Sequence, residues 1–382
     1  MAKKAPGKSF AQILSEEQSQ TKARSDAKIP LWSGLGLRYP TSLCLEQCSS
    51  QAAALYKASL LPQGCRVADL TGGLGVDSWA FSRRAKAVFY NERNPDLARV
   101  VERNFALLGV SNVTFNCFDV APSRPDWLSA LRDFGADRIY LDPARRSSVG
   151  GKVFRPQDCQ PDVIALLPQL RALTPYIMVK LSPMADISVL SAAFGCFLRE
   201  VHVVSLGNEV KELLCIVGPE ECAEPQIRVV DCESSRCTLA FTRSEEACAR
   251  SILASDAQLV PGAWLCEPGA ALLKAGAFKL CCEKFGLGKM DVSTHLYVSP
   301  QALAGTLPFK CFRILEVLPL DKLSMRSVAS RYPHADLTAR NIPLSTDSLR
   351  RALGLTPGPS GGIHLFAFGT PAGRRIAVCA SQ

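Results

Sequence analysis

A glycine-rich turn bracketed by two carboxylates is the part of this sequence best suited to bind a ligand. An apolar run that ends at Leu70 leads into the turn, and a helical pattern begins near Val76. Glycines let the backbone turn sharply and approach a ligand where a Cβ atom would collide. The following helix points its free N–H groups at the same place. The candidate binding residues of this turn are Asp69, Thr71, Gly72, Gly73, Gly75 and Asp77.

The charges around the turn indicate which nucleotide-type ligand it binds. The dinucleotide fingerprint G-x-G-x-x-G ends in a glycine, where this chain has Ser78. A pyrophosphate would be repelled by Asp69 and Asp77, whereas a cationic ligand with an amine would be attracted. We therefore expect S-adenosylmethionine as the cofactor. A nicotinamide oxidoreductase is the less favoured alternative.

Further acidic residues follow the next apolar runs along the chain. Glu92 ends the run 87–92, Asp119 follows the run 113–117, and Asp142 ends the run 138–142. A carboxylate at the tip of the strand beside the glycine turn is placed to bind a ribose, and one carboxylate can accept hydrogen bonds from both vicinal hydroxyls. The sequence thus predicts Glu92 as a ribose-binding residue. Asp119 has a second interpretation as a turn or helix cap.

The elements that must position these residues alternate between strand and helix. Such alternation predicts a parallel, doubly wound α/β sheet, and Gly207-Asn208 between two apolar runs predicts a closing hairpin. One amphipathic helix is expected over 43–61. The other expected helices begin near Val76 or span 95–108, 162–173 and 188–194, and the expected strands lie near 65–70 and at 87–92, 113–117, 138–142, 176–182, 201–206 and 213–217.

Residues 65–218 resemble a class I S-adenosylmethionine-dependent methyltransferase. Asp69-Leu-Thr-Gly-Gly-Leu-Gly75 is similar to the first motif of that family, and Asp142-Pro143-Ala144-Arg145 resembles the fourth motif of its nucleic-acid methyltransferases. The resemblance implies that Glu92 binds the ribose hydroxyls and that Asp119 lies near the adenine amine. It also implies a Rossmann-like sheet that ends in an antiparallel hairpin.

The candidate catalytic residues are Asp142, Pro143, Arg145 and Lys180. In base-methylating relatives the motif is Asp/Asn-Pro-Pro-aromatic, and it holds an amino group of an extruded base. Ala144 and Arg145 replace the second proline and the aromatic residue, which weakens the case for exocyclic-amine methylation. Arg145 is suited to stack on a base or grip a phosphate. Lys180 is suited to hold a phosphate or, if desolvated, to act as a base, and the polar loop 146–161 is expected to fold over the substrate.

The C-terminal part of the chain has an excess of basic residues and a family resemblance of its own. The formal net charge is +9, and residues 310–382 hold ten Lys/Arg against four Asp/Glu, an excess of +6. This excess favours a nucleic-acid partner. Residues 310–382 resemble a THUMP-like domain, and the segment from Glu267 to Phe278 resembles a small ferredoxin-like insert. We predict a helical extension (1–60), a methyltransferase domain (61–220), a connector with the ferredoxin-like segment (221–309) and a THUMP-like domain (310–382).

These features predict a cytoplasmic methyltransferase that acts on RNA, either tRNA or rRNA. The alternative is a non-catalytic RNA-binding protein that keeps the fold. No apolar run approaches the length of a membrane span, and no secretory signal precedes the sixteen cysteines, which are therefore expected to be reduced. Their spacings, such as Cys44-x3-Cys48 and Cys232-x4-Cys237, lack the partners of an iron–sulfur or zinc site, so no metal is predicted.

Overall fold

The computed structural model describes residues 22–145, 155–234, 236–303, 308–358 and 362–381. The chain divides into two compact units, which are described separately. The first unit comprises Met1–Gly207, Lys211–Pro225 and Cys232–Arg236, and the second comprises Asn208–Val210, Gln226–Asp231 and Cys237–Gln382. Within the described ranges, every helix is too short or too polar to span a membrane.

The first unit is built on a mostly parallel sheet. Its strands are β1 (Arg66–Asp69), β2 (Ala87–Asn91), β3 (Val113–Asn116), β4 (Arg138–Leu141), β7 (Ile177–Leu181), β8 (Leu198–Leu206) and β9 (Glu209–Val217). They lie in the order β8-β9-β7-β4-β1-β2-β3. The five strands from β7 to β3 are parallel, and β9 runs antiparallel to β7. A separate two-stranded ribbon joins β5 (Ala144–Arg145) to β6 (Cys159–Gln160).

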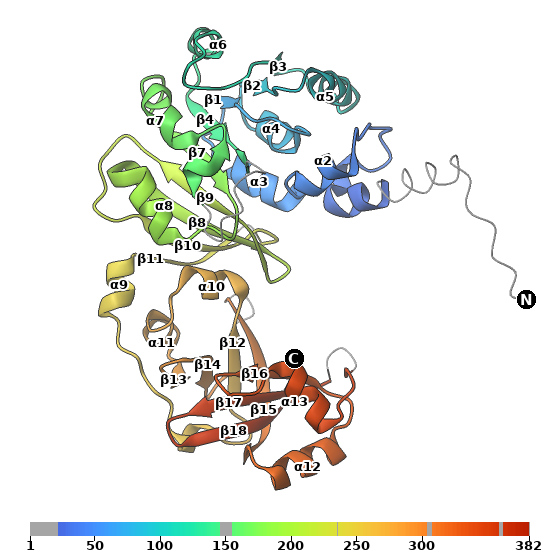
Figure 1. Ribbon diagram of the computed structural model, residues 1–382, viewed down its shortest axis with the longest axis vertical. Helices are drawn as coiled ribbons and strands as arrows, with labels where there is room; N and C mark the ends of the chain where they lie inside the picture. The colour runs from blue at the N-terminus through green and yellow to red at the C-terminus, as the bar shows by residue number, and fades with distance from the viewer. Residues whose placement is uncertain (1–21, 146–154, 235, 304–307, 359–361, 382) are drawn as a thin grey trace, which may run out of the picture. The chain divides into compact units, whose positions relative to one another are not determined.

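Helices cover both faces of this sheet. They are α2 (Ser42–Gln47), α3 (Gln51–Ser59), α4 (Val76–Ser82), α5 (Pro95–Leu107), α6 (Asp126–Phe134), α7 (Val163–Arg171) and α8 (Ile187–Phe194). Helices α4 and α5 lie on one side, and α6, α7 and α8 lie on the other (Figure 1). The starts of α5, α7 and α8 are set by short polar side chains: Asn94, Asp162 and Asp186 each accept hydrogen bonds from the first free backbone N–H groups.

The predicted doubly wound sheet with its closing hairpin is confirmed. Gly207 and Asn208 form the turn between β8 and β9 with φ values of 58° and 63°, the left-handed pair that a two-residue hairpin requires. The prediction of a single helix over 43–61 is wrong. The chain leaves the helix at Cys48, and Ser50 caps the new helix α3 by accepting a hydrogen bond from Ala53 N. Helix α6 was not predicted.

The second unit contains a seven-stranded sheet. Its strands are β12 (Trp264–Pro268), β13 (Gly288–Asp291), β14 (Thr294–Ser299), β15 (Phe309–Pro319), β16 (Asp336–Arg340), β17 (Ile363–Thr370) and β18 (Gly373–Ser381). Their order is β13-β14-β12-β15-β18-β17-β16. The unit also contains β10 (Gln226–Asp231), most of β11 (Arg236–Phe241), α9 (Arg243–Cys248), α10 (Ala270–Ala275), α11 (Leu280–Phe285), α12 (Lys322–Arg331) and α13 (Thr346–Leu353). In the segment from Glu267 to Phe278, which resembles a ferredoxin-like insert, Glu267 lies in β12 and Ala270–Ala275 form α10.

Alternating residues on these strands build two apolar clusters. Leu365 packs with Val328 of α12 and Leu349 of α13, whereas the next residue, Phe366, packs with Leu265 and its neighbours. The predicted domain boundary at residue 309 coincides with the start of β15, which is hydrogen-bonded to β12 on one side and to β18 on the other. One sheet therefore runs through the ferredoxin-like and THUMP-like segments.

Candidate active site

The turn after β1 has a backbone that only glycine accommodates at two of its positions. Gly75 has a φ of 82°, and a Cβ atom there would lie 2.7 Å from Cγ1 of Val101. A Cβ atom on Gly72 would lie 2.1 Å from Cε2 of Tyr90. The Tyr90 hydroxyl also donates to the carbonyl of Gly73 at 2.7 Å. These two glycines thus let the turn pack closely against β2 and α5, while the outer side of the turn stays open.

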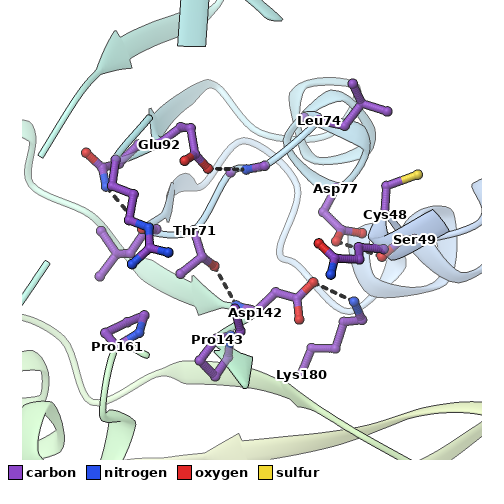
Figure 2. Close-up of a pocket in the computed structure, with 18 of the residues that line it drawn as sticks. Cys48, Ser49, Thr71, Leu74, Asp77, Glu92, Asp142, Pro143, Pro161 and Lys180 are labelled. Atoms are coloured by element: carbon purple, nitrogen blue, oxygen red, sulfur yellow. Dashed lines mark hydrogen bonds and ion pairs between the residues drawn. The ribbon is translucent and has the colours of Figure 1, made fainter. Parts of the chain in front are cut away.

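A cavity of about 630 Å³ opens beside the turn. It brings together most of the predicted site residues: Thr71, Gly72, Gly73, Gly75, Asp77, Glu92, Asp119, Asp142, Pro143 and Lys180. Figure 2 shows Glu92, Thr71, Asp142 and Lys180 converging on it from the ends of different strands. Cavities of this size are typical of cofactor and small-molecule sites.

Glu92 joins the glycine turn to the loop after β2. Its Oε2 accepts a hydrogen bond from Gly73 N at 3.0 Å, and its Oε1 accepts one from Asn94 N at 2.9 Å. A carboxylate has about four acceptor sites, so two remain for a ligand. This geometry suits the predicted ribose-binding role, which stays a prediction.

Asp119 lies on the same cavity but is held more loosely. Its side chain is 46% exposed and lies 3.5 Å from Nε of Arg124. The segment before it is fixed by Asn91, a residue that the sequence analysis did not identify. The buried Asn91 side chain donates to the carbonyls of Leu70 and Phe118 at 3.1 Å and accepts from Phe118 N at 2.8 Å. The signal for Asn91 in the sequence was a polar residue at the end of a buried strand.

Asp69 does not face the cavity, contrary to our expectation. Its side chain is buried beneath the turn, where it accepts hydrogen bonds from Ser78 Oγ at 2.6 Å and Thr71 N at 3.1 Å. Burial raises the pKa of this carboxyl to about 7, against the lowering effect of the Ser78 hydrogen bond. Asp69 therefore shapes the turn and is not placed to touch a ligand.

Asp77 does reach the cavity, but it already has protein partners. Its Oδ1 lies 3.1 Å from Nζ of the buried Lys57, and its Oδ2 accepts from Ser49 Oγ at 2.8 Å. Burial alone would raise the pKa of Asp77, but the charge of Lys57, helped by Lys180 and the Ser49 hydrogen bond, lowers it below its ordinary value. The side chain is thus an ionised carboxylate at neutral pH.

Asp142 and Lys180 form an ion pair at the wall of the cavity. Their Oδ2 and Nζ atoms are 2.5 Å apart, and Asp142 N donates to Thr71 Oγ1 at 2.5 Å. Burial would lower the pKa of Lys180, but the carboxylates of Asp142, Glu212 and Asp77 outweigh this effect and raise it above its ordinary value. Lys180 is therefore a cation here, and the alternative in which it acts as a base is not supported.

The remaining predicted substrate residues are only partly placed. The backbone of Arg145 pairs with Cys159 in the β5–β6 ribbon, but its side chain and residues 146–154 of the predicted covering loop lie outside the described residues. From the far end of that loop, Gln160 and Pro161 line the cavity.

A wall of the cavity that the sequence analysis missed comes from the N-terminal helices. Cys44, Gln47, Cys48 and Ser49 line it, at the end of α2 and in the break before α3. Burial raises the pKa of the Cys48 thiol to about 11, so this cysteine is a neutral wall residue. Among the described residues no group of three or more His, Cys, Asp and Glu side chains is arranged to hold a metal ion.

Comparisons with known proteins agree with this geometry. Residues 264–305 match a family model described as a ferredoxin-like domain, and residues 309–382 match one described as THUMP domain-like. A crystal structure of a candidate methyltransferase from Porphyromonas gingivalis W83 is 31% identical, with a TM-score of 0.83, over 96% of this chain and 89% of that one. An uncharacterized S-adenosylmethionine-dependent methyltransferase of Mycobacterium tuberculosis is 25% identical over 317 residues, 82% of this chain and 80% of the relative.

The similarity to the Porphyromonas gingivalis structure extends through both units of the chain. The chain belongs to the S-adenosylmethionine-dependent methyltransferases that carry ferredoxin-like and THUMP-like segments, and S-adenosylmethionine is its cofactor.

Proposed function

We propose that this methyltransferase modifies a nucleotide of RNA, either tRNA or rRNA. The observation that carries the proposal is the excess of +6 in residues 310–382, the segment that matches the THUMP-like model. Phosphate neutralisation by Lys and Arg supplies most of the sequence-independent affinity for nucleic acids. A basic segment of this kind would recruit RNA to the enzyme.

Some basic side chains of this segment are paired with acids, and others are exposed. Arg331, Arg340 and Arg375 are paired with Glu316, Glu267 and Asp256 at distances of 2.7–2.9 Å. Lys322 and Arg326, in contrast, are exposed on α12 one turn apart. Spacing by four residues puts both on one face of the helix, where they are available to contact phosphates.

In the cavity we assign the donor to the glycine turn and the target to Asp142. Glu92 would bind the ribose of the donor, and Thr71, Gly72, Gly73 and Gly75 would contact it through the turn. When bound, S-adenosylmethionine supplies an electrophilic methyl group. The Asp142 carboxylate would accept a hydrogen bond or proton from the attacking atom, while Lys180 holds it in place. Pro143 and Arg145 would position the target nucleotide.

Methyl transfer is a displacement at one carbon, so alignment of the two reactants and a proton acceptor are the contributions required of the protein. Asp142 N donates a hydrogen bond to Thr71 Oγ1 in the glycine turn. With the donor at the turn and the target at Asp142, this hydrogen bond would fix the distance between the two reactants. The protein would then provide the alignment through its backbone.

The test of the substrate class is methyl incorporation from labelled S-adenosylmethionine into total RNA, followed by nucleoside analysis of RNA from cells with and without the gene. Charge reversal by Lys322→Glu with Arg326→Glu should weaken RNA binding and reduce the salt dependence by about two phosphate contacts. Lys284→Glu, at an exposed lysine of α11, is the control for a charge reversal outside this segment, and it is compared with Lys322→Glu alone. If the enzyme methylates protein and transfers no methyl group to RNA, RNA is excluded as the substrate.

A further inference from the structure

A buried ammonium group lies directly behind the cavity. Lys57, on α3, is fully buried. Its Nζ lies 2.8 Å from Ser49 Oγ, 2.9 Å and 3.0 Å from the two carboxylate oxygens of Glu212, and 3.1 Å from Oδ1 of Asp77. These contacts use all three N–H groups of the ammonium, and they join the N-terminal helices to α4 and β9.

Asp77 is the member of this cluster that reaches the cavity. Besides Lys57, it accepts hydrogen bonds from Ser49 Oγ at 2.8 Å and from the Tyr140 hydroxyl at 2.9 Å, both on Oδ2. Its Oδ1 is buried and has no hydrogen-bond partner among the described residues, so beside the ion pair with Lys57 its negative charge is not balanced by a further donor. Figure 2 shows Asp77 beside Ser49 and Cys48, away from Glu92 across the turn.

The charges of the cluster do not cancel. Lys57 contributes one positive charge against the two carboxylates of Asp77 and Glu212, both at most 7% exposed. Lys180 and Asp142 form one ion pair and add no net charge, although the charge of Lys180 also acts on Asp77. One negative charge is therefore left over among these five side chains, with Lys211 as a further cation in the cavity lining. A buried charge without a counter-charge is strongly unfavourable, and the cavity side of Asp77 is where a cation would relieve it.

We propose that Lys57 is a positioning residue for the methyl donor: it holds the Asp77 carboxylate ionised at the wall of the cavity, where its negative charge attracts a cationic group of the donor. The donor carries two such groups, the ammonium of its amino-acid end and the sulfonium. The inference rests on the proposed placement of the donor at the glycine turn, and it is independent of RNA as the acceptor.

The experiment is calorimetric titration of the full chain with three ligands. S-adenosylmethionine carries both cationic groups, S-adenosylhomocysteine carries only the ammonium, and 5′-methylthioadenosine carries neither. The key variant is Lys57→Met with Glu212→Gln, which keeps the net charge of the cluster. It should bind S-adenosylmethionine about 10–100-fold more weakly, as expected for a lost charge-assisted contact, and bind 5′-methylthioadenosine within about twofold of wild type. S-adenosylhomocysteine then separates the ammonium from the sulfonium.

Three variants control this result. Glu212→Gln alone leaves Lys57 beside Asp77 and should lose less affinity than the double variant. Asp77→Asn should reproduce the ligand pattern of the double variant, and it decides the matter if the double variant does not fold. Glu92→Gln should weaken all three ligands, because all contain the ribose.

Several results would overturn the proposal. Wild-type affinity for S-adenosylmethionine in the double variant or in Asp77→Asn removes the role of the carboxylate. Equal losses for S-adenosylmethionine and 5′-methylthioadenosine show that Lys57 is merely structural, and so does an equal loss in Glu212→Gln alone. If Glu92→Gln binds all three ligands with wild-type affinity, the proposed placement of the donor is itself wrong. If Glu92→Gln binds them more weakly while the Lys57 and Asp77 variants keep wild-type affinity, only this inference is wrong.

Discussion

The Asp142→Asn substitution tests the proposed chemistry most directly. The backbone of residue 142 stays anchored, because its N–H donates to Thr71 Oγ1 at 2.5 Å, and the side chain keeps its size. The substitution removes the negative charge that lies 2.5 Å from Lys180 Nζ. Loss of a positioned proton acceptor typically costs about 10²–10⁴-fold in rate, which corresponds to about 3–5 kcal/mol in the activation barrier.

The assay is single-turnover methyl incorporation into RNA at saturating donor, after the donor affinity of each variant has been measured. Asp119→Asn is the matched control, since Asp119 is a second cavity carboxylate but is 46% exposed and lies at the other side of the turn. We expect it to change donor affinity and to leave the saturated rate nearly unchanged. If Asp142→Asn transfers methyl at the wild-type rate, or if both variants lose the same factor, Asp142 is not the acceptor.

The structure leads to three further expectations. The pKa of Asp69 is about 7 in the folded chain and about 4 when unfolded. The free energy of unfolding of the wild type should therefore fall by about 2–4 kcal/mol as the pH rises from about 4 to about 7. Denaturant unfolding of Asp69→Asn should not show this loss. Gly72→Ala, whose Cβ would meet Tyr90 at 2.1 Å, should lower stability by about 3 kcal/mol or more. Gly73→Ala, whose Cβ meets only Thr71 O at 3.9 Å, should cost only the backbone strain of its φ of 51°, about 1–2 kcal/mol. Thermal melts that rank the two variants the other way would contradict the packing. Removal of residues 309–382 should leave residues 237–308 sensitive to limited proteolysis, because β12 loses its pairing with β15.

Local patterns in the sequence predicted the sheet of the first unit well. The apolar runs that became β1, β2, β4 and β7 are short and bounded by polar residues, so period and length together identify them. Their order in space follows from alternation with helices. The acids at their ends therefore converge on one cavity, as Glu92 and Asp142 do.

The features that were missed or wrongly predicted from the sequence depend on contacts that the local pattern does not show. Lys57 and Glu212 are 155 positions apart, and nothing near Lys57 distinguishes it from a solvated helix lysine. Asp69 was expected to face the ligand, but its rotation toward Ser78 depends on the backbone of the turn. The break between α2 and α3 was hidden because apolar residues continue on both sides of Ser50, whose side chain caps the second helix.

The position of β18 in the second unit constrains when this unit can fold. Strand β18 lies between β15 and β17 in the interior of the sheet, and its residues Ile376 and Val378 are fully buried. The sheet therefore cannot close around its centre during synthesis until residues up to 381 have left the ribosome. Until then β15 and β17 each expose an unpaired edge, and such edges are sites of aggregation. The first unit has all of its strands earlier in the chain, so the glycine turn and its cavity can form while the THUMP-like segment is still being made.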